Sequence, residues 1–208
     1  MKFAIAAQHD DNYNEFAKLT LYSNHAEYCK RHGYDLLITK VYPSDHSGGF
    51  QMMKFLIDNL PNYDWIWHVG VDTLVMNHTI KIEDKIDNNY DYIISVDDNG
   101  PNVHSTLTKN SKNGLDWLNF IWSKRFEYKD DCWQENRVVH HYHNKEPWNS
   151  FIKVQPYRFM NSVAMKERWN VMNHPAQFEI GDWLLHMSAT STEKRIELIN
   201  HFKDKVVR

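Results

Sequence analysis

Asp72 is a single carboxylate between two apolar runs, which makes it the residue of this chain best suited to hold a metal ion. The run from Trp65 to Val71 is aromatic and β-branched and predicts a buried strand. A second apolar run, Leu74 to Met76, follows almost at once. An ionised carboxylate between buried segments is costly unless a positive partner offsets it, and a divalent cation is such a partner. A solvated turn residue is the alternative, but the apolar flanks favour a metal ligand.

Strands and helices alternate along the chain and place Asp72 at the end of one strand. Hydrophobic periodicity predicts strands over 2–7, 34–41, 65–71, 90–96, 103–108, 153–155 and 182–186, and helices over 14–32, 50–59, 113–126, 133–143 and 192–206. Gly33 is expected to end the first helix. This alternation predicts an α/β sandwich with a mostly parallel central sheet, in which ligands bind at the carboxyl ends of strands.

Length and composition fit one soluble globular domain that spans residues 1–208. Hydrophobic residues make up 42% of the chain and charged residues 25%, and no run approaches the ~20 apolar residues of a membrane span. The net charge of −3 gives no sign of binding to nucleic acid or to an anionic membrane. The two cysteines, Cys29 and Cys132, are expected to be reduced thiols, because nothing else suggests a disulfide scaffold.

The stretch from Tyr63 to Asn77, Y-D-W-I-W-H-V-G-V-D-T-L-V-M-N, resembles a pattern of glycosyltransferase family 34. That family, which includes yeast galactosyl- and mannosyltransferases and plant xyloglucan xylosyltransferases, has W-I-W-W-L-D-A-D-A-L-I-M-N there. Its two aspartates form a D-x-D motif that holds a divalent cation against the pyrophosphate of a sugar nucleotide. This chain keeps only the second aspartate, in Gly70-Val71-Asp72. The resemblance implies a Rossmann-like GT-A fold and a transferase that uses nucleotide sugars.

Further segments are similar to the same family, in the same order, over nearly the whole chain. They are residues 28–36, 102–111, 155–162 and 181–189, together with Lys54, which falls at the lysine of a W-x-K helix. In the second of these segments His104 replaces a glycine of the pattern N-x-G-S-F-L-I-R-N-S. The last segment, G-D-W-L-L-H-M-S-A, ends in Ala189 where the family has glycine.

The resemblance implies ligands for a cation and for a nucleotide. The cation would be Mn²⁺, or Mg²⁺, held by Asp72 and by His186, the late histidine of the family, and a nitrogen ligand suits Mn²⁺ better. The base of the donor would be uridine. The residues implied to bind the nucleotide are Ala6, Ala7, Gln8, Lys54, Val71, Asp72, Ala189 and Lys194. Ser191 stands where the family has a lysine, so Lys194 or Arg195 would replace its phosphate contact.

Gly70 removes one acidic neighbour from the predicted cation, which should therefore bind more weakly in the absence of nucleotide. Three outcomes are open. The glycine could admit a bulkier group, Asp97 or Asp98 could compensate from the end of the strand over 90–96, or activity could be lost.

Glu135 and Asn136 lie where the family carries D-D-Q at the start of a helix. A carboxylate and an amide beneath the anomeric carbon would stabilise an oxocarbenium-like transition state and orient the donor. The family retains anomeric configuration, with the leaving phosphate accepting the proton of the acceptor hydroxyl. An ordinary polar helix start is the alternative for these two residues. His140 and His143 can share a helix face and are expected to be solvated or to lie in the acceptor groove.

The sequence thus predicts a metal-dependent glycosyltransferase that moves a hexose or pentose from a UDP-linked sugar to a hydroxyl acceptor. A glycan or glycoconjugate is the expected acceptor, and a hydroxymethylated DNA base, as in some phages, is the alternative. A non-catalytic module that binds nucleotide sugars is the alternative from another class, favoured by Gly70, Ala189 and Ser191. The yeast and plant relatives have a membrane anchor. Without one, we expect a cytoplasmic enzyme of viral or bacterial origin, or a catalytic domain separated from its anchor.

Overall fold

A mixed sheet forms the centre of the computed structural model, which describes residues 1–129, 131 and 133–208. Its strands are β1 Phe3–His9, β2 Asp35–Lys40, β3 Trp65–Val69, β5 Tyr92–Asp97, β6 Gly100–Lys109 and β7 Ile152–Gln155, in the order β2-β1-β3-β6-β5-β7. Within the described residues, β6 is antiparallel to both of its neighbours, and the other pairs in this sheet are parallel. The predicted α/β class with a mostly parallel central sheet is confirmed.

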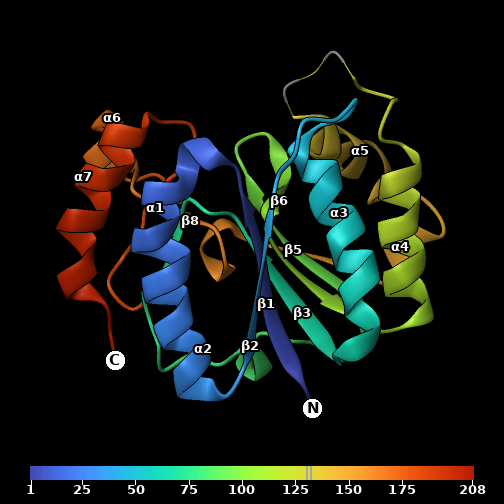
Figure 1. Cartoon of the computed structure of the whole chain (residues 1–208), viewed down its shortest axis with the longest axis horizontal. Coiled ribbons are helices and arrows are strands. Elements are labelled where there is room, and N and C mark those ends of the chain that lie inside the picture. Colours follow the sequence, from blue (N-terminus) through green and yellow to red (C-terminus); the bar gives the residue numbers. More distant parts are fainter. Residues whose placement is uncertain (130, 132) are drawn as a thin grey trace.

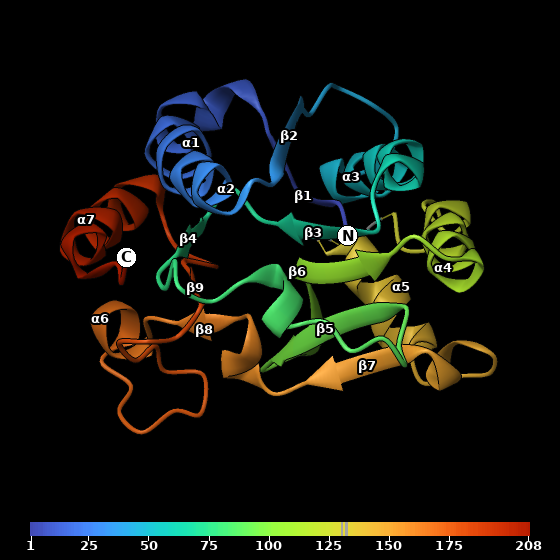
Figure 2. The same cartoon turned by 90° about the horizontal axis from the view of Figure 1, so that it is seen from below.

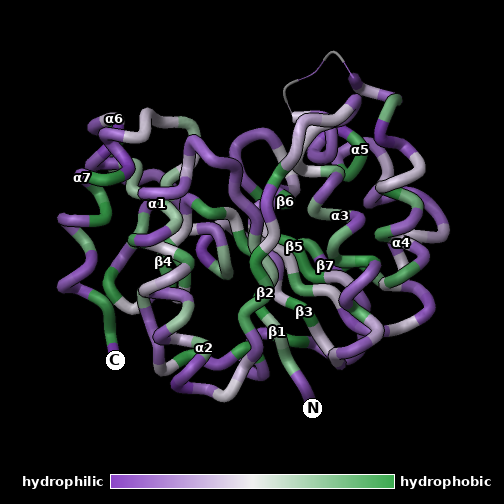
Figure 3. The backbone as a smooth tube through the Cα atoms, in the orientation of Figure 1, coloured by the Kyte–Doolittle hydropathy of each residue, from purple (hydrophilic) through white to green (hydrophobic). Residues whose placement is uncertain are grey.

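Helices cover both faces of this sheet (Figures 1 and 2). One layer contains α1 Asn14–Leu19 and α2 Ala26–His32, and the other contains α3 Gly48–Asn59, α4 Lys112–Ser123 and α5 Gln134–Tyr142. Successive side chains of β1 point to opposite faces of the sheet and therefore belong to two different clusters of the core. Phe3 and Ile5 belong to the cluster under α1 and α2. Ala4 and Ala6 belong to the cluster under α3, α4 and α5. In Figure 3 hydrophobic residues accordingly gather along the central strands.

A smaller sheet brings the late part of the chain to Asp72. It consists of β4 Thr73–Val75, β8 Ser162–Val163 and β9 Leu184–His186, in the order β4-β9-β8, and it packs with α6 Met165–Trp169 and α7 Thr192–Phe202. In the antiparallel pair of β4 and β9, Thr73 lies opposite His186. The N–H of Met187 donates to the carbonyl of Asp72 at 2.8 Å. This register places the turn that follows β3 next to the end of β9.

The first predicted helix, 14–32, is interrupted by a π-helical turn at Thr20–His25. In this turn the hydroxyl of Thr20 donates to the carbonyl of Val71 at 2.8 Å, which ties the helix to the residue before Asp72. The second half, α2, ends as predicted at Gly33, whose φ of 72° is left-handed. The short elements β4, β8 and α6 were not predicted, because so few residues carry little periodicity. Short 3₁₀ turns lie at Asp11–Tyr13, Leu60–Asn62, Ile82–Asp84, Trp148–Ser150, Tyr157–Phe159 and Lys203–Lys205.

Two expectations from composition concern the cysteines and membrane spans. Cys29 is a free, buried thiol, and burial raises its pKa to about 12, which keeps it protonated. The expectation for Cys132 lies outside the described residues. Among the helices of the described part of the chain, none has both the length and the apolar character needed to cross a bilayer.

His25 should make the fold sensitive to acid. Its ring nitrogens lie 3.2 Å from the carbonyl of Thr20 and 3.1 Å from the hydroxyl of Thr73, and burial lowers its pKa from 6.5 to about 4. The contribution of the neutral ring to stability is complete above pH 6.5. It is lost as the pH falls towards 4, because the unfolded chain then takes up a proton that the folded chain does not.

Between pH 7.5 and pH 5.5, the free energy of unfolding should therefore fall by about 1.4 kcal/mol on account of His25. Urea unfolding at the two pH values measures the difference, and the variant His25→Gln should lack this share of it. An identical pH dependence in wild type and His25→Gln would show that another group is responsible.

Candidate metal and donor site

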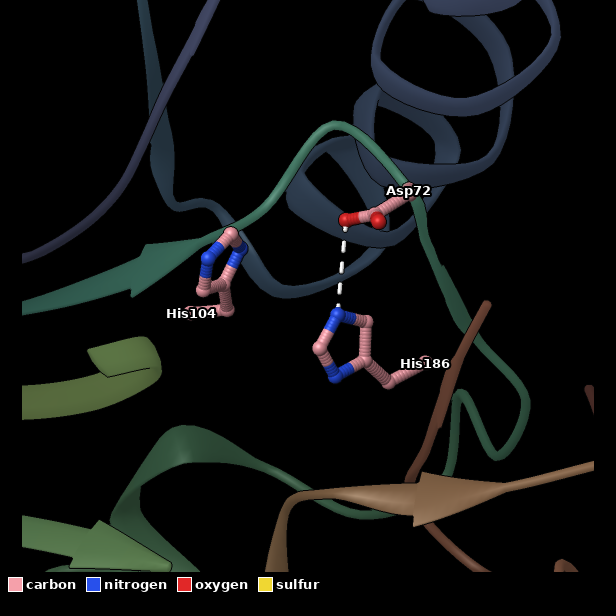
Figure 4. A group of neighbouring side chains, drawn as sticks. All are labelled: Asp72, His104 and His186. Atoms are coloured by element: carbon pink, nitrogen blue, oxygen red, sulfur yellow. Dashed lines mark ion pairs between the residues drawn. The ribbon is translucent and has the colours of Figure 1, made fainter. Parts of the chain in front are cut away.

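Asp72, His104 and His186 come together beyond the carboxyl end of β3 (Figure 4). Each residue offers one ligand atom, and these atoms lie within 4.8 Å of one another. Asp72 is 7% exposed and His186 is 2% exposed, while His104 is half-buried. Opposite ligands of a divalent cation, each bound at roughly 2.1 Å, lie about 4.2 Å apart. A small contraction of this cluster would seat such a cation.

Strand pairing brings these three residues together from distant parts of the sequence. Val69 of β3 lies opposite Ser105 of β6, and one step further the N–H of Gly70 donates to the carbonyl of His104 at 2.7 Å. His186 ends β9, which pairs with β4 directly after Asp72. The turn between β3 and β4 therefore presents Asp72 to both histidines.

Asn161 determines which nitrogen of His186 is available. The Nδ2 of Asn161 donates to the carbonyl of Val96 at 3.1 Å, so its Oδ1 is the atom that lies 2.7 Å from the Nδ1 of His186. An amide oxygen only accepts, hence Nδ1 carries a proton. When the ring is neutral, Nε2 therefore carries the lone pair, and Nε2 has no hydrogen-bond partner among the described residues. It faces Asp72 Oδ1 at 3.5 Å, which leaves two acceptors on either side of a gap suited to a cation.

Asp72 is held in its ionised form. Burial raises the pKa of this carboxyl, but His186, His104 and Arg195 together outweigh burial and bring the pKa well below its usual range. Arg195, in the first turns of α7, lies 3.3 Å from Asp72 Oδ2 through Nη2, and its Nε donates to the carbonyl of Met187 at 3.0 Å. Asp72 therefore stays negative at neutral pH, as a ligand of a hard cation must. Burial also lowers the pKa of His104.

Two adjoining cavities open onto this cluster. The larger, of about 520 Å³, reaches α5, β8 and α6, and the smaller, of about 250 Å³, runs along the end of β1. Residues that line both cavities are Gly49, Asp72, His104, Glu135 and Arg195. The larger volume is typical of a site for a small organic ligand. The possible metal ligands therefore lie at the junction of two spaces that could hold different parts of one donor.

Four of the predicted donor-binding residues line these cavities, namely Gln8, Val71, Asp72 and Ala189. Ala6 and Ala7 do not present side chains there. Both are completely buried, because the side chains of a central strand point into the two helix layers. Gln8, at the end of the same strand, donates to the carbonyl of Gly48 at 2.7 Å, and its Oε1 has no partner among the described residues.

Lys54 and Lys194, both predicted to contact phosphate, lie elsewhere. Lys54 forms an ion pair with Asp58 on the exposed side of α3, and Lys194 pairs with Glu197 at 2.7 Å. Neither is among the described residues that line the two cavities. Consecutive residues of a helix point in different directions, so Arg195 turns inward where Lys194 turns outward. Of the two alternatives for the phosphate contact, the structure favours Arg195.

Glu135 and Asn136 begin α5, and both line the larger cavity. Glu135 Oε2 accepts from the hydroxyl of Ser47 at 3.0 Å, and its carboxyl packs so closely on Gly49 that an added Cβ there would lie 2.1 Å from its Cδ. Asn136 Oδ1 accepts the N–H of Val103 at 3.0 Å, which joins α5 to β6. Asn136 thus has a structural contact, whereas Glu135 presents a carboxylate to both cavities.

Arg168 of α6 was not predicted as a site residue. Its Nη1 lies 3.4 Å from Ser188 Oγ, while Nε and Nη2 are buried without hydrogen-bond partners among the described residues. Burial lowers its pKa to about 10, and the charge of Arg195 acts in the same direction. Arg168 is not among the described residues that line the two cavities. Its unused donors, close to the charge of Arg195, would suit an anion such as a diphosphate if one reached them. No sequence pattern singles out Arg168, because its place depends on how β8 and α6 fold against β9.

Ala189, which also lines the larger cavity, has a φ of 48°. This left-handed conformation costs an alanine roughly 1–2 kcal/mol relative to its ordinary backbone conformations. The sequence pattern that this segment resembles has glycine there. Ala189 therefore keeps the left-handed conformation that a glycine at this position would adopt without strain.

The acidic residues considered as compensation for Gly70 lie further along the larger cavity. Asp97 Oδ2 accepts from Asn102 at 2.6 Å, and Asp98 pairs with His174 at 3.2 Å. Neither belongs to the group of possible metal ligands found within the described residues. The geometry does not support compensation by Asp97 or Asp98, because the residue opposite Gly70 in the sheet is His104.

The helical histidines also remain apart from the metal cluster. His140 lines the larger cavity, where its Nε2 lies 2.7 Å from the carbonyl of Pro101. His143 Nδ1 lies 3.0 Å from the carbonyl of Val139, within its own helix. Both rings are therefore engaged with backbone oxygens, and His143 is not among the described residues that line the larger cavity.

Comparison with known proteins finds a family match in the first part of the chain. Residues 3–90 match the galactosyl transferase GMA12/MNN10 family. The matched residues, which make up less than half of the chain, are similar to this family of glycosyltransferases. The probable α-1,6-mannosyltransferase MNN10 of Saccharomyces cerevisiae is 26% identical over 180 residues, which cover 67% of this chain and 46% of that protein. The chain therefore spans about half the length of the curated relative it matches.

Solved structures show the same fold at low sequence identity. A glycosyltransferase involved in the glycosylation of the major capsid of PBCV-1 has a TM-score of 0.74 and 18% identity, covering 95% of this chain and 99% of that chain. A mutant of Drosophila β1,4-galactosyltransferase 7, in complex with manganese, UDP-Gal and xylobiose, has a TM-score of 0.50 and 10% identity, covering 89% and 71%. The chain thus has the GT-A fold of these glycosyltransferases, as predicted.

Proposed function

We propose that this chain is a glycosyltransferase, which moves a sugar from a UDP-linked donor to a hydroxyl acceptor with the help of Mn²⁺ or Mg²⁺. The observation that carries the proposal is that Asp72 Oδ1 and His186 Nε2, two acceptors 3.5 Å apart, face each other at the junction of two cavities. A divalent cation bound there would act as a Lewis acid on the leaving diphosphate. The Drosophila complex with manganese and UDP-Gal supports this choice of cation and donor.

The sugar would lie near Glu135, which reaches both cavities. During transfer the bond between the anomeric carbon and the diphosphate oxygen breaks, and a bond to the acceptor oxygen forms. The carboxylate of Glu135 would stabilise the positive charge that develops on the sugar ring. If the acceptor attacks from the side of the leaving group, its proton passes to the diphosphate and the anomeric configuration is retained. Such a reaction needs no separate protein base.

A glycan or glycoconjugate is the proposed acceptor. The larger cavity carries the partly exposed aromatic residues Trp133 and Trp169 and the acidic residues Asp97 and Asp98. Aromatic faces offer an apolar surface to a sugar ring, and carboxylates accept hydrogen bonds from its hydroxyls. The same acids would repel the phosphates of DNA, which need positive groups around them.

The first test of this function is thermal unfolding with UDP, in the presence and absence of Mn²⁺. A ligand at about 100 times its dissociation constant stabilises a protein by about 2.7 kcal/mol, so the melting temperature should rise clearly when both are present. A rise of similar size with UDP alone would contradict a metal-bridged diphosphate. Release of free sugar from the donor would separate a transferase from a non-catalytic binding module.

Arg168 should contribute to diphosphate binding together with Arg195. Its unpartnered Nε and Nη2 can form charge-assisted hydrogen bonds, each worth about 1.5–3 kcal/mol. We therefore expect Arg168→Met to weaken binding of UDP with Mn²⁺ by at least tenfold. Isothermal titration calorimetry measures the affinity. The matched control is Arg125→Met, because Arg125 lies just after α4 and is not among the described residues that line the cavities. Equal affinities for wild type and Arg168→Met would exclude Arg168 from the site.

A further inference from the structure

His104 occupies the space that a side chain at position 70 would need. A Cβ added to Gly70 would lie 2.7 Å from Asp72 Oδ1 and 3.1 Å from His104 Nδ1, both closer than ordinary van der Waals contact. A side chain at position 70 would therefore displace the carboxylate of Asp72 and press on the ring of His104. The patterns that these two segments resemble have the opposite choice, an aspartate at position 70 and a glycine at position 104.

We propose that His104 is the third protein ligand of the divalent cation, beside Asp72 and His186, and that it replaces the missing first aspartate. The ligand atoms of the three residues already lie within 4.8 Å of one another. The inference rests on the proposed function only in that the same cation would also contact the diphosphate of the donor. It changes the protein ligands from two carboxylates and one imidazole to one carboxylate and two imidazoles.

The backbone of His104 is held firmly in the position that this role requires. Its N–H donates to Asn102 Oδ1 at 2.9 Å, and its carbonyl accepts the N–H of Gly70 at 2.7 Å. Its ring lies nearly parallel to that of His186, with an angle of 25° and a centroid separation of 5.4 Å. The unpartnered Nε2 of His186, on a side chain that is 2% exposed, faces the same space. The backbone hydrogen bonds and the ring contact thus hold His104 beside His186.

A site with two imidazoles and one carboxylate favours a different metal ion from a site with two carboxylates and one imidazole. Nitrogen ligands suit Mn²⁺, Co²⁺ and Zn²⁺, whereas Mg²⁺ prefers an all-oxygen shell and keeps several waters. The second imidazole also supplies a protein ligand that does not depend on the nucleotide. We therefore expect this glycosyltransferase to bind Mn²⁺ or Co²⁺ without UDP, and to bind Mg²⁺ much more weakly.

Calorimetric titration of the full chain with MnCl₂, CoCl₂ and MgCl₂, without nucleotide, tests the proposal directly. His104→Ala should lower the affinity for Mn²⁺ by more than about tenfold, since even residues that only support a metal ligand have effects of that size. His141→Ala is the matched control, because His141 is exposed and contacts Lys145. Electron spin-echo spectra of bound Mn²⁺ should show two coordinated imidazoles in wild type and one in His104→Ala.

A reciprocal exchange keeps the test informative if a single variant is poorly folded. Gly70→Asp combined with His104→Gly moves the proposed third metal ligand from position 104 on β6 to position 70, at the end of β3. This double variant should bind Mg²⁺ better relative to Mn²⁺ than wild type does, and its Mn²⁺ spectrum should show one imidazole. Circular dichroism and melting temperature establish that each variant is folded before it is titrated.

The outcomes separate this proposal from the proposed function. If His104→Ala binds Mn²⁺ as tightly as wild type while UDP still needs Mn²⁺, the role of His104 is overturned and the transferase reaction stands. If His104→Ala loses Mn²⁺ but no nucleotide binds to wild type, the metal site stands and the donor assignment falls. A wild-type chain that binds none of the three ions, or shows one imidazole on Mn²⁺, would overturn the proposal.

Discussion

Replacing Asp72 by asparagine should lower the rate of sugar transfer by roughly 10²- to 10³-fold, the loss typical when one group that stabilises transition-state charge is removed. Asparagine keeps the shape of the side chain but not its negative charge. The pKa of Asp72 lies well below its usual range, so the wild-type residue is charged under any ordinary assay condition. The variant would also leave His186 and Arg195 without their acidic partner. Initial rates with a UDP-sugar at saturating Mn²⁺ measure the effect.

The matched control for this variant is Asp98→Asn. Asp98 lines the same cavity, but its side chain is exposed and pairs with His174. We expect Asp98→Asn to retain metal-dependent binding of UDP, whereas Asp72→Asn should lose it. Equal losses in both variants would mean that the cation lies nearer to Asp98, and that the site has been misplaced along the cavity.

Replacing Trp183 by alanine should lower the free energy of unfolding by about 3–5 kcal/mol, because it removes a large buried ring and leaves a cavity. Trp183 is 1% exposed, and its ring stacks on that of Trp67 with centroids 3.9 Å apart and planes at 19°. Trp67 belongs to β3, and Trp183 directly precedes β9. The contact therefore joins the strand that leads to Asp72 with the strand that ends at His186. Urea unfolding, followed by circular dichroism, measures the loss.

Trp133→Ala serves as the control for this stability measurement. Trp133 is 47% exposed, so its removal should change the free energy of unfolding by no more than about 0.5 kcal/mol. Trp183→Phe should fall between the two, since an aromatic ring remains but its volume is smaller. A loss below about 1 kcal/mol in Trp183→Ala would contradict the view that this stacked pair holds the two sheets together.

The strands and helices near the site follow from local patterns in the sequence. The aromatic and β-branched run before Asp72 predicts β3, the periodicity before Gly33 predicts the helical segment, and a polar turn between apolar runs marks Asp72 itself. These features could be predicted because buried positions recur with a regular period among a few neighbouring residues. The association of Asp72 with His186 came from a resemblance, and the structure places the two side chains 3.5 Å apart.

Contacts between segments that are far apart in the sequence could not be predicted in this way. Lys194 and Arg195 are adjacent and similar in charge, and only the packing of α7 turns Arg195 towards Asp72. Arg168 lies beside Ser188 because α6 follows β8, an element of two residues that is too short to show a sequence pattern. Ala6 and Ala7 of β1 were predicted to contact the donor, but their side chains are covered by the two helix layers.

Residue type and local order thus predict the class of fold, the position of Asp72 at a strand end and the likeness to a glycosyltransferase family. The partners of Asp72 depend on strand register, which sets His104 beside Gly70 and His186 beside the turn after β3. A shift of one residue in either register would turn these side chains to the opposite face of the sheet. Register is fixed by the fit of whole strands to the core, so the composition of the metal cluster emerges only when the chain is folded.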